Sequence, residues 1–586
     1  MKTKWKILGL ICVLTAGFML FGCSSVSTGT TTTTSATTST SGTATTTTTN
    51  TSSTTSPPLQ DYGMIIGSVK NSSGVAISSV TVTANASSGA TNSEGWFSLA
   101  NLPASTREVV TYSKTGYISV QKLYSVATGE ATYAEVVLNA VNSAQTITAT
   151  TGGTVTDVGV TNLSASVTIA ANSVVDSLGN LYAGTVSVTL TPQDPTVSLE
   201  AFPGIFEGTD LSGETVAFQS FGFLNVSLAD ASGNALNIAS GSSMQMSMQV
   251  TAELTASAEA TIPLWYFDTA TSTWIQTGIA TYDATSQSYV ANVAWPLAAA
   301  SSAYAVPIIV FPTAWNFDKP FNIAYITGRV LDSSGTVVQN AEVVCQGTGF
   351  RSSNYTSSDG TFRVRVPAGL SFDYYAQKSN QQSTSQIISS VLSVGEERAV
   401  GDITIPNAAQ ISVTLSWGAD PRDLDSHLTI PGSVEGHSRY HLYYANRSYT
   451  ASSSWPNVSL DTDDMDGYGP EVVSIYRLYP GVYRYCVHDY AGNSDISNSS
   501  ASVNLIVSSG SSSGIYNFTP PTGAVGVNDV WRVFDVTVNA SGNITAVSSV
   551  NDYLYGISSS DHNYYSPDFA TTEAGTISGY GLIHTK

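Results

Sequence analysis

From Met64 onward, short alternating segments are separated by turn residues, and this pattern limits the folds open to the chain. In residues 184–190, Val186, Val188 and Leu190 alternate with hydroxyl or small residues. A period of two places the apolar side chains on one face of a β-strand. Strands of about 4–8 residues, with turns roughly every 8–12 residues, are typical of β-sandwiches. We therefore expect an all-β protein, and its 586 residues suffice for about three to five domains.

The composition excludes one class of partner. Charged residues make up only 11% of the chain, against about 25% in ordinary soluble domains. The net charge is −21, so the chain repels nucleic-acid phosphates, and we expect no nucleic-acid partner. A general acidic excess serves solubility, whereas cation binding requires that the acidic residues cluster.

The N-terminus has the pattern of a secretion signal. Lys2, Lys4 and Lys6 precede an almost wholly apolar stretch at 7–21. This stretch is shorter than the about 20 residues of a membrane span, which favours a signal peptide at 1–22. Its end, Leu20-Phe21-Gly22-Cys23, resembles the bacterial lipobox. The resemblance implies that Cys23 is lipidated and becomes the new N-terminus; the alternative is ordinary cleavage and release.

A tract of Thr, Ser and Gly follows at 24–58 and closes with two prolines. Such a tract cannot bury apolar surface, so residues 23–58 are expected to form a disordered tether behind the lipidated cysteine. Ser24 resembles the residue that directs lipoproteins to the outer membrane. We therefore expect a lipid anchor in a membrane, and a location at the bacterial outer membrane or cell surface.

Two segments, 59–144 and 319–408, repeat one order of motifs. The order is G-x-V, Ser-Gly, a Val strand, and a turn ending in G-x-F, followed by a Pro-containing strand end. It resembles the carboxypeptidase-regulatory-like family, over residues 63–140 and 322–406. The resemblance implies two prealbumin-like β-sandwiches without a catalytic group, which space or stiffen other modules. The matching residues of the first copy are Gly67, Val69, Gly74, Val80, Val82, Thr91, Gly95, Phe97, Leu102, Pro103, Gly116 and Tyr117.

The middle region, 145–318, lies between the two copies and is also rich in expected strands. The order of its elements resembles extracellular β-domains of the cartilage-intermediate-layer type, which implies no chemistry. Its large aromatic residues, Trp265 and Trp274, are expected in a core rather than in a ligand platform.

The C-terminal segment, 409–586, contains all six histidines and a cluster of acidic residues. On a strand, Asp423, Asp425 and His427 share one face, with about 6.5–7 Å between successive members. A nearby loop adds further carboxylates, and calcium takes about 6–8 oxygen ligands from more than one element. The acidic residues expected to bind calcium are Asp423, Asp425, Asp461, Asp463, Asp464 and Glu471.

The acidic loop does not fit an EF-hand. Asp464, Asp466 and Gly467 match positions three, five and six, but Thr462 and Val473 stand where the first and last ligands belong. Calcium is therefore the one cofactor we consider, in a site of another kind. The alternative is structural, because Asp in turns accepts hydrogen bonds from its own backbone.

Four motifs in this segment, W-x5-DLDSHL, LDTDD, GYGPE and GVYRYCVHDY, resemble a family of uncharacterised bacterial envelope proteins of the YfaP type, over residues 409–548. The resemblance implies a secreted or surface-associated domain and names no reaction. The matching residues are Trp417, Asp423, Asp425, His427, Asp461, Asp463, Asp464, Gly469, Pro470, Glu471, Tyr485, His488 and the segment Trp531–Phe534.

Enzyme motifs are largely absent from the sequence: it contains no H-E-x-x-H, no Walker A and no dinucleotide fingerprint. One G-x-S-x-G occurs at 510–514, but it lies in a Ser/Gly run and is expected to form a flexible loop. Cys345 and Cys486 lie in apolar strand patterns and are expected to be buried rather than reactive. We expect a non-catalytic cell-envelope lipoprotein with a structural or adhesive role. Two alternatives remain, a surface protein that binds calcium or carbohydrate, and a hydrolase built on the acid and histidine cluster. A glycan or protein would be the surface ligand, and the aromatic faces available for sugar rings are Tyr440, Tyr443, Tyr444 and Tyr449.

Overall fold

The computed structural model describes residues 62–557 with short gaps, together with residue 565 and residues 583–584. The gaps fall at 86, 160–162, 198, 296–312, 334, 379–380, 406–408, 432–438, 450–457, 492–494, 508–511, 513 and 523–528. The expected signal peptide, the lipidated Cys23 and the tether lie outside the described residues.

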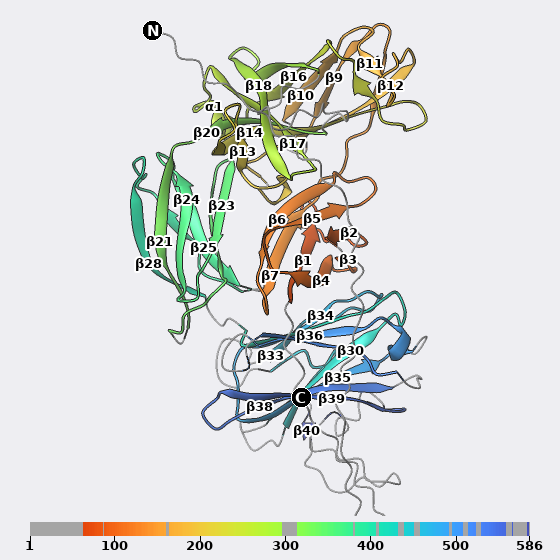
Figure 1. Cartoon of the computed structure of the whole chain (residues 1–586), viewed down its shortest axis with the longest axis vertical. Coiled ribbons are helices and arrows are strands. Elements are labelled where there is room, and N and C mark those ends of the chain that lie inside the picture. Colours follow the sequence, from red (N-terminus) through yellow and green to blue (C-terminus); the bar gives the residue numbers. More distant parts are fainter. Residues whose placement is uncertain are drawn as a thin grey trace, which may run out of the picture. The chain divides into compact units, whose positions relative to one another are not determined.

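Strands dominate the described residues (Figure 1). The helical elements among them are one short α-helix, α1 (Ala252–Thr255), and two 3-10 turns, η1 (Leu199–Ala201) and η2 (Ile496–Asn498). The predicted all-β fold class is thereby confirmed. Within the part that the structure describes, no helix is long and apolar enough to cross a membrane.

Residues 62–137 form two sheets with the strand orders β4-β1-β7 and β3-β2-β5-β6. Strand β1 runs antiparallel to β4 and parallel to β7. The inward residues of both sheets, among them Ile65, Val82, Phe97 and Tyr112, form one core. The strands are β1 (Tyr62–Lys70), β2 (Thr81–Ala84), β3 (Ser87–Ala90), β4 (Trp96–Pro103), β5 (Ser105–Ser113), β6 (Val120–Val126) and β7 (Ala131–Val137).

Residues 323–405 repeat this topology. Their sheets have the orders β24-β21-β28 and β23-β22-β25-β26, with β27 also paired to β25. Strand β21 is again antiparallel to the strand on one side, β24, and parallel to the strand on the other, β28. The prediction that the two segments share one fold is confirmed. The strands are β21 (Ile323–Asp332), β22 (Glu342–Gly347), β23 (Phe350–Tyr355), β24 (Thr361–Pro367), β25 (Phe372–Lys378), β26 (Gln381–Gln382), β27 (Gln386–Ile388) and β28 (Glu397–Ile405).

One buried threonine joins the same two loops in each copy. The hydroxyls of Thr91 and Thr356 each donate to a backbone carbonyl, at 2.6 and 2.7 Å, and each accepts from a backbone N–H at 2.9 Å. Each hydroxyl therefore satisfies two buried backbone groups that lie outside the sheet ladders. Their partners are the carbonyl of Ile77 and the N–H of Val80 in the first copy, and the carbonyl of Val338 and the N–H of Ala341 in the second.

A glycine in the central strand of each copy allows the parallel neighbour to approach. A Cβ added at Gly67 would lie 1.9 Å from the carbonyl oxygen of Ala134, and one added at Gly328 would lie 2.4 Å from that of Gly401. No side chain fits at such distances, which explains why the G-x-V motif appears in both copies.

Residues 145–320 form an eleven-stranded sheet with the order β8-β12-β14-β20-β17-β18-β19-β16-β10-β9, with β13 paired to β14 and β18. Strands β11 and β15 form a separate two-stranded sheet. The strands are β8 (Gln145–Thr148), β9 (Gly153–Val158), β10 (Ser164–Ile169), β11 (Val174–Val175), β12 (Thr185–Gln193), β13 (Glu207–Thr209), β14 (Thr215–Ala229), β15 (Asn237–Ile238), β16 (Ser243–Gln249), β17 (Thr261–Asp268), β18 (Thr273–Asp283), β19 (Ser288–Ala294) and β20 (Ala314–Pro320).

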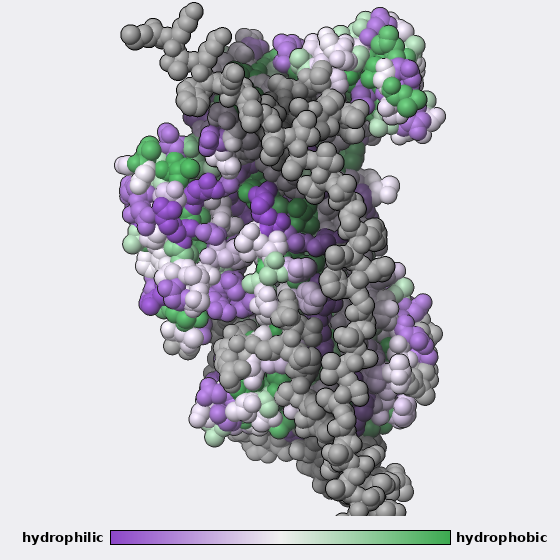
Figure 2. Space-filling view, viewed as in Figure 1, coloured by the Kyte–Doolittle hydropathy of each residue, from purple (hydrophilic) through white to green (hydrophobic). Residues whose placement is uncertain are grey.

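The residues expected in cores are buried. Trp265 and Trp274 have no exposed surface, and the indole N–H of Trp274 donates to the carbonyl of Pro203 at 2.9 Å. Cys345 and Cys486 are buried free thiols, and burial raises the pKa of Cys486 to about 12. Polar and apolar residues are interspersed over the described surface visible in Figure 2.

Residues 411–584 form two six-stranded sheets with the orders β32-β33-β34-β29-β36-β37 and β39-β38-β35-β30-β31-β40. One core, which includes Leu415, Tyr485 and Trp531, draws on both sheets, so this segment is a β-sandwich. The strands are β29 (Ile411–Ser416), β30 (Leu424–Pro431), β31 (Arg439–Leu442), β32 (Ser448–Tyr449), β33 (Val458–Thr462), β34 (Glu471–Ile475), β35 (Gly481–Asp489), β36 (Ser502–Val507), β37 (Gly514–Phe518), β38 (Val530–Val538), β39 (Ile544–Leu554) and β40 (Ile583–His584).

Candidate functional site

Strand β30 carries the first acidic residues of the C-terminal sandwich. Asp423 directly precedes this strand. Asp425 and His427 lie on it, each two residues after the previous polar side chain. Strand β35 pairs with β30 so that Asp425 stands opposite His488 and His427 opposite Cys486. Opposed residues of an antiparallel pair share a face, so the register places Asp425 beside His488.

The other sheet supplies the second part of the site. Glu471 begins strand β34 and pairs with Leu415 of β29. Its Oε2 atom accepts a hydrogen bond from the backbone N–H of Ser426 on β30 at 2.5 Å. This bond holds the glutamate against the opposite sheet. Asp463 lies in the loop that joins β33 to β34.

Asp425, Asp463 and Glu471 bring one carboxylate oxygen each within 4.8 Å of one another. Asp425 is 3% exposed and Glu471 has no exposed surface. A buried oxygen of each residue, Oδ2 of Asp425, Oδ1 of Asp463 and Oε1 of Glu471, has no hydrogen-bond partner among the described residues. Buried polar atoms are normally paired, so these unpaired carboxylate oxygens distinguish the group from ordinary buried acids among the described residues.

The electrostatics of this acid group are unfavourable for a protein without a ligand. Burial raises the pKa of Glu471 well above its ordinary value, and the neighbouring charge of Asp425 adds to the shift. Burial also raises the pKa of Asp425, while the adjacent His488 opposes that shift. Positive charge reaches the group at its edge, where Arg447 Nη1 lies 3.6 Å from Asp463 Oδ2.

Asp423 and Asp464 lie beside the acid group. Burial raises the pKa of Asp423 to about 7, and the charges of Asp425 and Asp463 contribute. Burial raises the pKa of Asp464 to about 8, and a hydrogen bond to Asp466 adds to that effect. Both carboxyls therefore resist ionisation unless a cation compensates the charge.

Asp461 is not brought to the group. A β-bulge separates Leu460 from Thr462 in the pairing of β33 with β34, and Asp461 is the residue between them. Its carboxylate accepts hydrogen bonds from the hydroxyls of Ser459 and, at 2.5 Å, Ser474. A bulge redirects a side chain, which explains why this aspartate is satisfied locally.

A second group of metal-binding atoms was not predicted from the sequence. Asp425, His427 and His488 also bring one ligand atom each within 4.8 Å of one another. His427 forms a hydrogen bond through Nδ1 with Nε2 of His441 at 2.9 Å, and the ring of Tyr565 stacks on His427 at 4.2 Å. One sequence signal could have identified this group. Cys486 and His488 are two residues apart on β35, and they pair with His427 and Asp425, which have the same spacing on β30.

The tyrosines considered for sugar binding divide into two sets. Tyr440 and Tyr443 are buried, with 8% and 9% exposure, which favours sheet packing. Tyr444 is exposed, and its ring lies 5.5 Å from the exposed ring of Tyr490 at an angle of 64°. Tilted rings of this kind do not form one flat platform.

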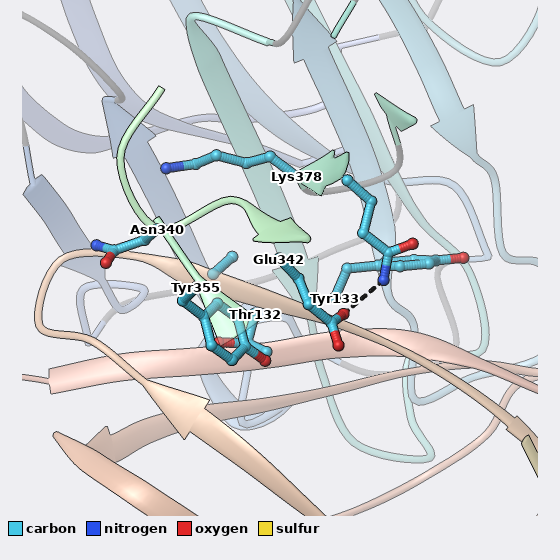
Figure 3. A pocket seen from close by; sticks show the side chains of 8 residues that line it. Thr132, Tyr133, Asn340, Glu342, Tyr355 and Lys378 are labelled. Carbon is cyan, nitrogen blue, oxygen red and sulfur yellow. Dashed lines mark hydrogen bonds between the residues drawn. The ribbon is translucent and has the colours of Figure 1, made fainter. Parts of the chain in front are cut away.

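Another acidic residue provides a contrast within the second of the two repeated sandwiches, residues 323–405 (Figure 3). Glu342 on β22 accepts a hydrogen bond from Gln377 Nε2 at 2.7 Å and another from Arg351 Nη2 at 3.3 Å. Both of its oxygens are therefore satisfied by neighbours in the same sheet, whereas Oε1 of Glu471 has no hydrogen-bond partner among the described residues.

No family model matches the chain. Among solved structures it is similar to the Bacillus anthracis TIE protein, at 12% identity and a TM-score of 0.13, over 59% of this chain and 51% of that one. It is also similar to BcpA, the major pilin subunit of Bacillus cereus, at 9% identity and a TM-score of 0.12, over 59% and 100% of the two chains. A streptococcal ancillary pilin matches at 10% identity and a TM-score of 0.14, over 46% and 90%. The chain thus spans about half the length of the Bacillus anthracis protein, 51%, and the likenesses carry no argument about function.

Proposed function

We propose that this chain is a non-catalytic, lipid-anchored protein of the bacterial cell surface whose C-terminal sandwich binds calcium. The observation that carries the calcium site is the meeting of Asp425, Asp463 and Glu471, which come from two sheets and a loop. Each contributes a buried oxygen without a hydrogen-bond partner among the described residues.

Calcium fits this group for reasons of size and ligand chemistry. All three ligands are carboxylate oxygens, which hard cations prefer. Two oxygens at about 2.3–2.6 Å from one ion are separated by no more than about 5.2 Å, and the observed limit of 4.8 Å lies inside that bound. Water would complete a shell of about 6–8 ligands around an ion held by these three carboxylates.

A structural role for the ion follows from its position. Glu471 belongs to one sheet and Asp425 to the other, so a shared ion joins the two halves of the sandwich. Binding to the native state alone adds about 2.7 kcal/mol at a hundredfold excess over Kd. The repeated sandwiches act as spacers in this proposal, and the buried, protonated thiol of Cys486 argues against a nucleophile in the C-terminal one.

The calcium proposal is tested by melting the full chain in calcium and in chelator. We expect calcium to raise the melting temperature by several degrees, because the ion cancels the repulsion of three carboxylates, two of them buried. Glu471→Gln removes this response. Asp461→Asn is the matched control and keeps it, because Asp461 is already hydrogen-bonded to two serines. A wild-type chain that melts identically in both solutions would refute the calcium site.

The anchor is tested separately by labelling cells with a fatty acid. The wild-type chain takes up the label and stays with the membrane fraction, whereas Cys23→Ser does neither. A Cys23→Ser chain that is still labelled rules out this anchor.

A further inference from the structure

The imidazole of His488 is oriented by a backbone carbonyl. Its Nε2 atom lies 3.0 Å from the carbonyl oxygen of Ile557. A carbonyl only accepts hydrogen bonds, so Nε2 carries a proton. His488 has no exposed surface, and its Nδ1 atom has no hydrogen-bond partner among the described residues. In the neutral ring, Nδ1 is therefore a buried lone pair.

This lone pair faces the carboxylate of Asp425, and the distance between them fits two ligands of one metal ion. His488 Nδ1 lies 3.6 Å from Asp425 Oδ2. A charge-assisted hydrogen bond between the two groups would measure about 2.7–2.9 Å, so the two atoms are farther apart than in such a bond. Two ligands bound at about 2.0–2.2 Å to one tetrahedral ion lie roughly 3.3–3.6 Å apart, which agrees with the observed spacing.

A third ligand is held in place from the other side. A ring nitrogen of His427 lies within 4.8 Å of the ligand atoms of Asp425 and His488. The hydrogen bond to His441 and the stacked ring of Tyr565, at an interplanar angle of 11°, fix the orientation of His427. Histidines that bind metals characteristically use their second nitrogen in this way, as His488 also does with a carbonyl.

We propose that Asp425, His427 and His488 form a second cation site, for a divalent transition metal of the Zn²⁺ class. Two imidazole nitrogens and one carboxylate suit Zn²⁺ and disfavour calcium, which selects oxygen ligands. Asp425 belongs to both groups, and its Oδ2 atom, which faces His488, bridges the two ions in this proposal. The three residues are buried, so the metal is taken up as the domain folds and acts as a structural ion.

The test uses the untagged full chain, stripped of metal and then dialysed against Zn²⁺ or, as a spectroscopic probe, Co²⁺. We expect Zn²⁺ to remain bound after dialysis. We also expect bound Co²⁺ to give absorption bands that disappear when Zn²⁺ displaces the Co²⁺. If the wild-type chain binds neither ion, the proposal is overturned and the histidines serve packing alone.

Two variants separate this site from the calcium site. His488→Gln replaces the imidazole with an amide that can still donate to Ile557, and it should lose one Zn²⁺ per chain while keeping the calcium response. Glu471→Gln should lose the calcium response and keep Zn²⁺. If His488→Gln still melts in calcium as the wild type does and binds as much Zn²⁺, the assignment of His488 is wrong.

Discussion

Two aspartates of this chain lie in loops, yet they are stabilised in opposite ways. Asp359, in the turn before β24, is exposed, and its Oδ1 accepts hydrogen bonds from the backbone N–H of Thr361 at 3.0 Å and from the hydroxyl of Ser357 at 2.7 Å. The Thr361 hydroxyl also donates to Oδ1, at 2.6 Å, and this bond, followed by those from the Ser357 hydroxyl and the Thr361 N–H, lowers the pKa of Asp359 to about 2. Burial raises the pKa of Asp464, in the loop before β34, to about 8.

The difference shows that the surroundings, and not the residue type, decide what an acidic loop does. The turn around Asp359 supplies its own donors, so the charge stabilises the turn and needs no ligand. The loop before β34 directs carboxylates toward other carboxylates, so charge accumulates where donors are few. Only the second arrangement gains from a cation.

The largest effect should come from Glu471→Gln, measured by thermal melting of the full chain. In chelator the variant should melt higher than the wild type, because it removes a buried charge yet keeps an oxygen for the N–H of Ser426. In calcium the order should reverse, because the wild type gains about 2.7 kcal/mol at a hundredfold excess over Kd. If the wild type melts higher in both solutions, Glu471 is a structural residue and the contrast with Asp359 disappears.

Thr91→Val and Thr356→Val test the two repeated sandwiches, which lie outside the proposed calcium site. Each substitution leaves a buried backbone N–H without its acceptor, at a cost of about 1–3 kcal/mol. We expect both variants to be destabilised to a similar degree, with no dependence on calcium. Calorimetry of the full chain measures this. If only one of the two variants is destabilised, the buried threonine does not stabilise both copies in the same way.

The pH dependence of stability should distinguish the two kinds of acid. Asp423 and Asp464 have folded-state pKa values of about 7 and about 8, above the ordinary value of an aspartate. A raised pKa contributes stability that is present below the unfolded value, about 4, and lost as pH rises through the folded value. In chelator, the melting temperature of the C-terminal transition should therefore fall between about pH 4 and pH 8, and calcium should abolish the fall. An equal fall in both solutions would contradict the account.

The smallest effect should come from Asp359→Asn. The amide retains one oxygen acceptor, but it loses the charge that strengthens the bonds from Ser357 and Thr361. We expect a slight decrease in melting temperature that calcium does not change. A calcium-dependent change in this variant would mean that the turn acids also bind the ion.

The sequence was sufficient for the fold class and for part of the site. Alternation predicted the strands, and the repeated motifs predicted the shared topology, because Gly67 and Gly328 meet the same steric requirement. Asp425 and Glu471 were both expected in an acidic site, and the structure brings them together with a third carboxylate.

The remaining features depend on pairing between distant strands. His488 reaches Asp425 only through the register of β30 with β35, which no local pattern contains. Asp461 follows the same acidic pattern as its neighbours, but a bulge turns it toward Ser459 and Ser474. The serine hydroxyls that donate to Asp461 reach it only in the folded structure. The sequence alone therefore could not show that Asp463, and not Asp461, joins the acid group.

The most direct test of the central claim is the uptake of calcium by the metal-free full chain, measured by equilibrium dialysis against Glu471→Gln and Asp461→Asn. We predict saturable binding in the wild type and in Asp461→Asn, and its loss in Glu471→Gln, because Glu471 belongs to the group of three carboxylates and Asp461 does not. Equal calcium uptake by all three chains, or none by the wild type, would contradict it.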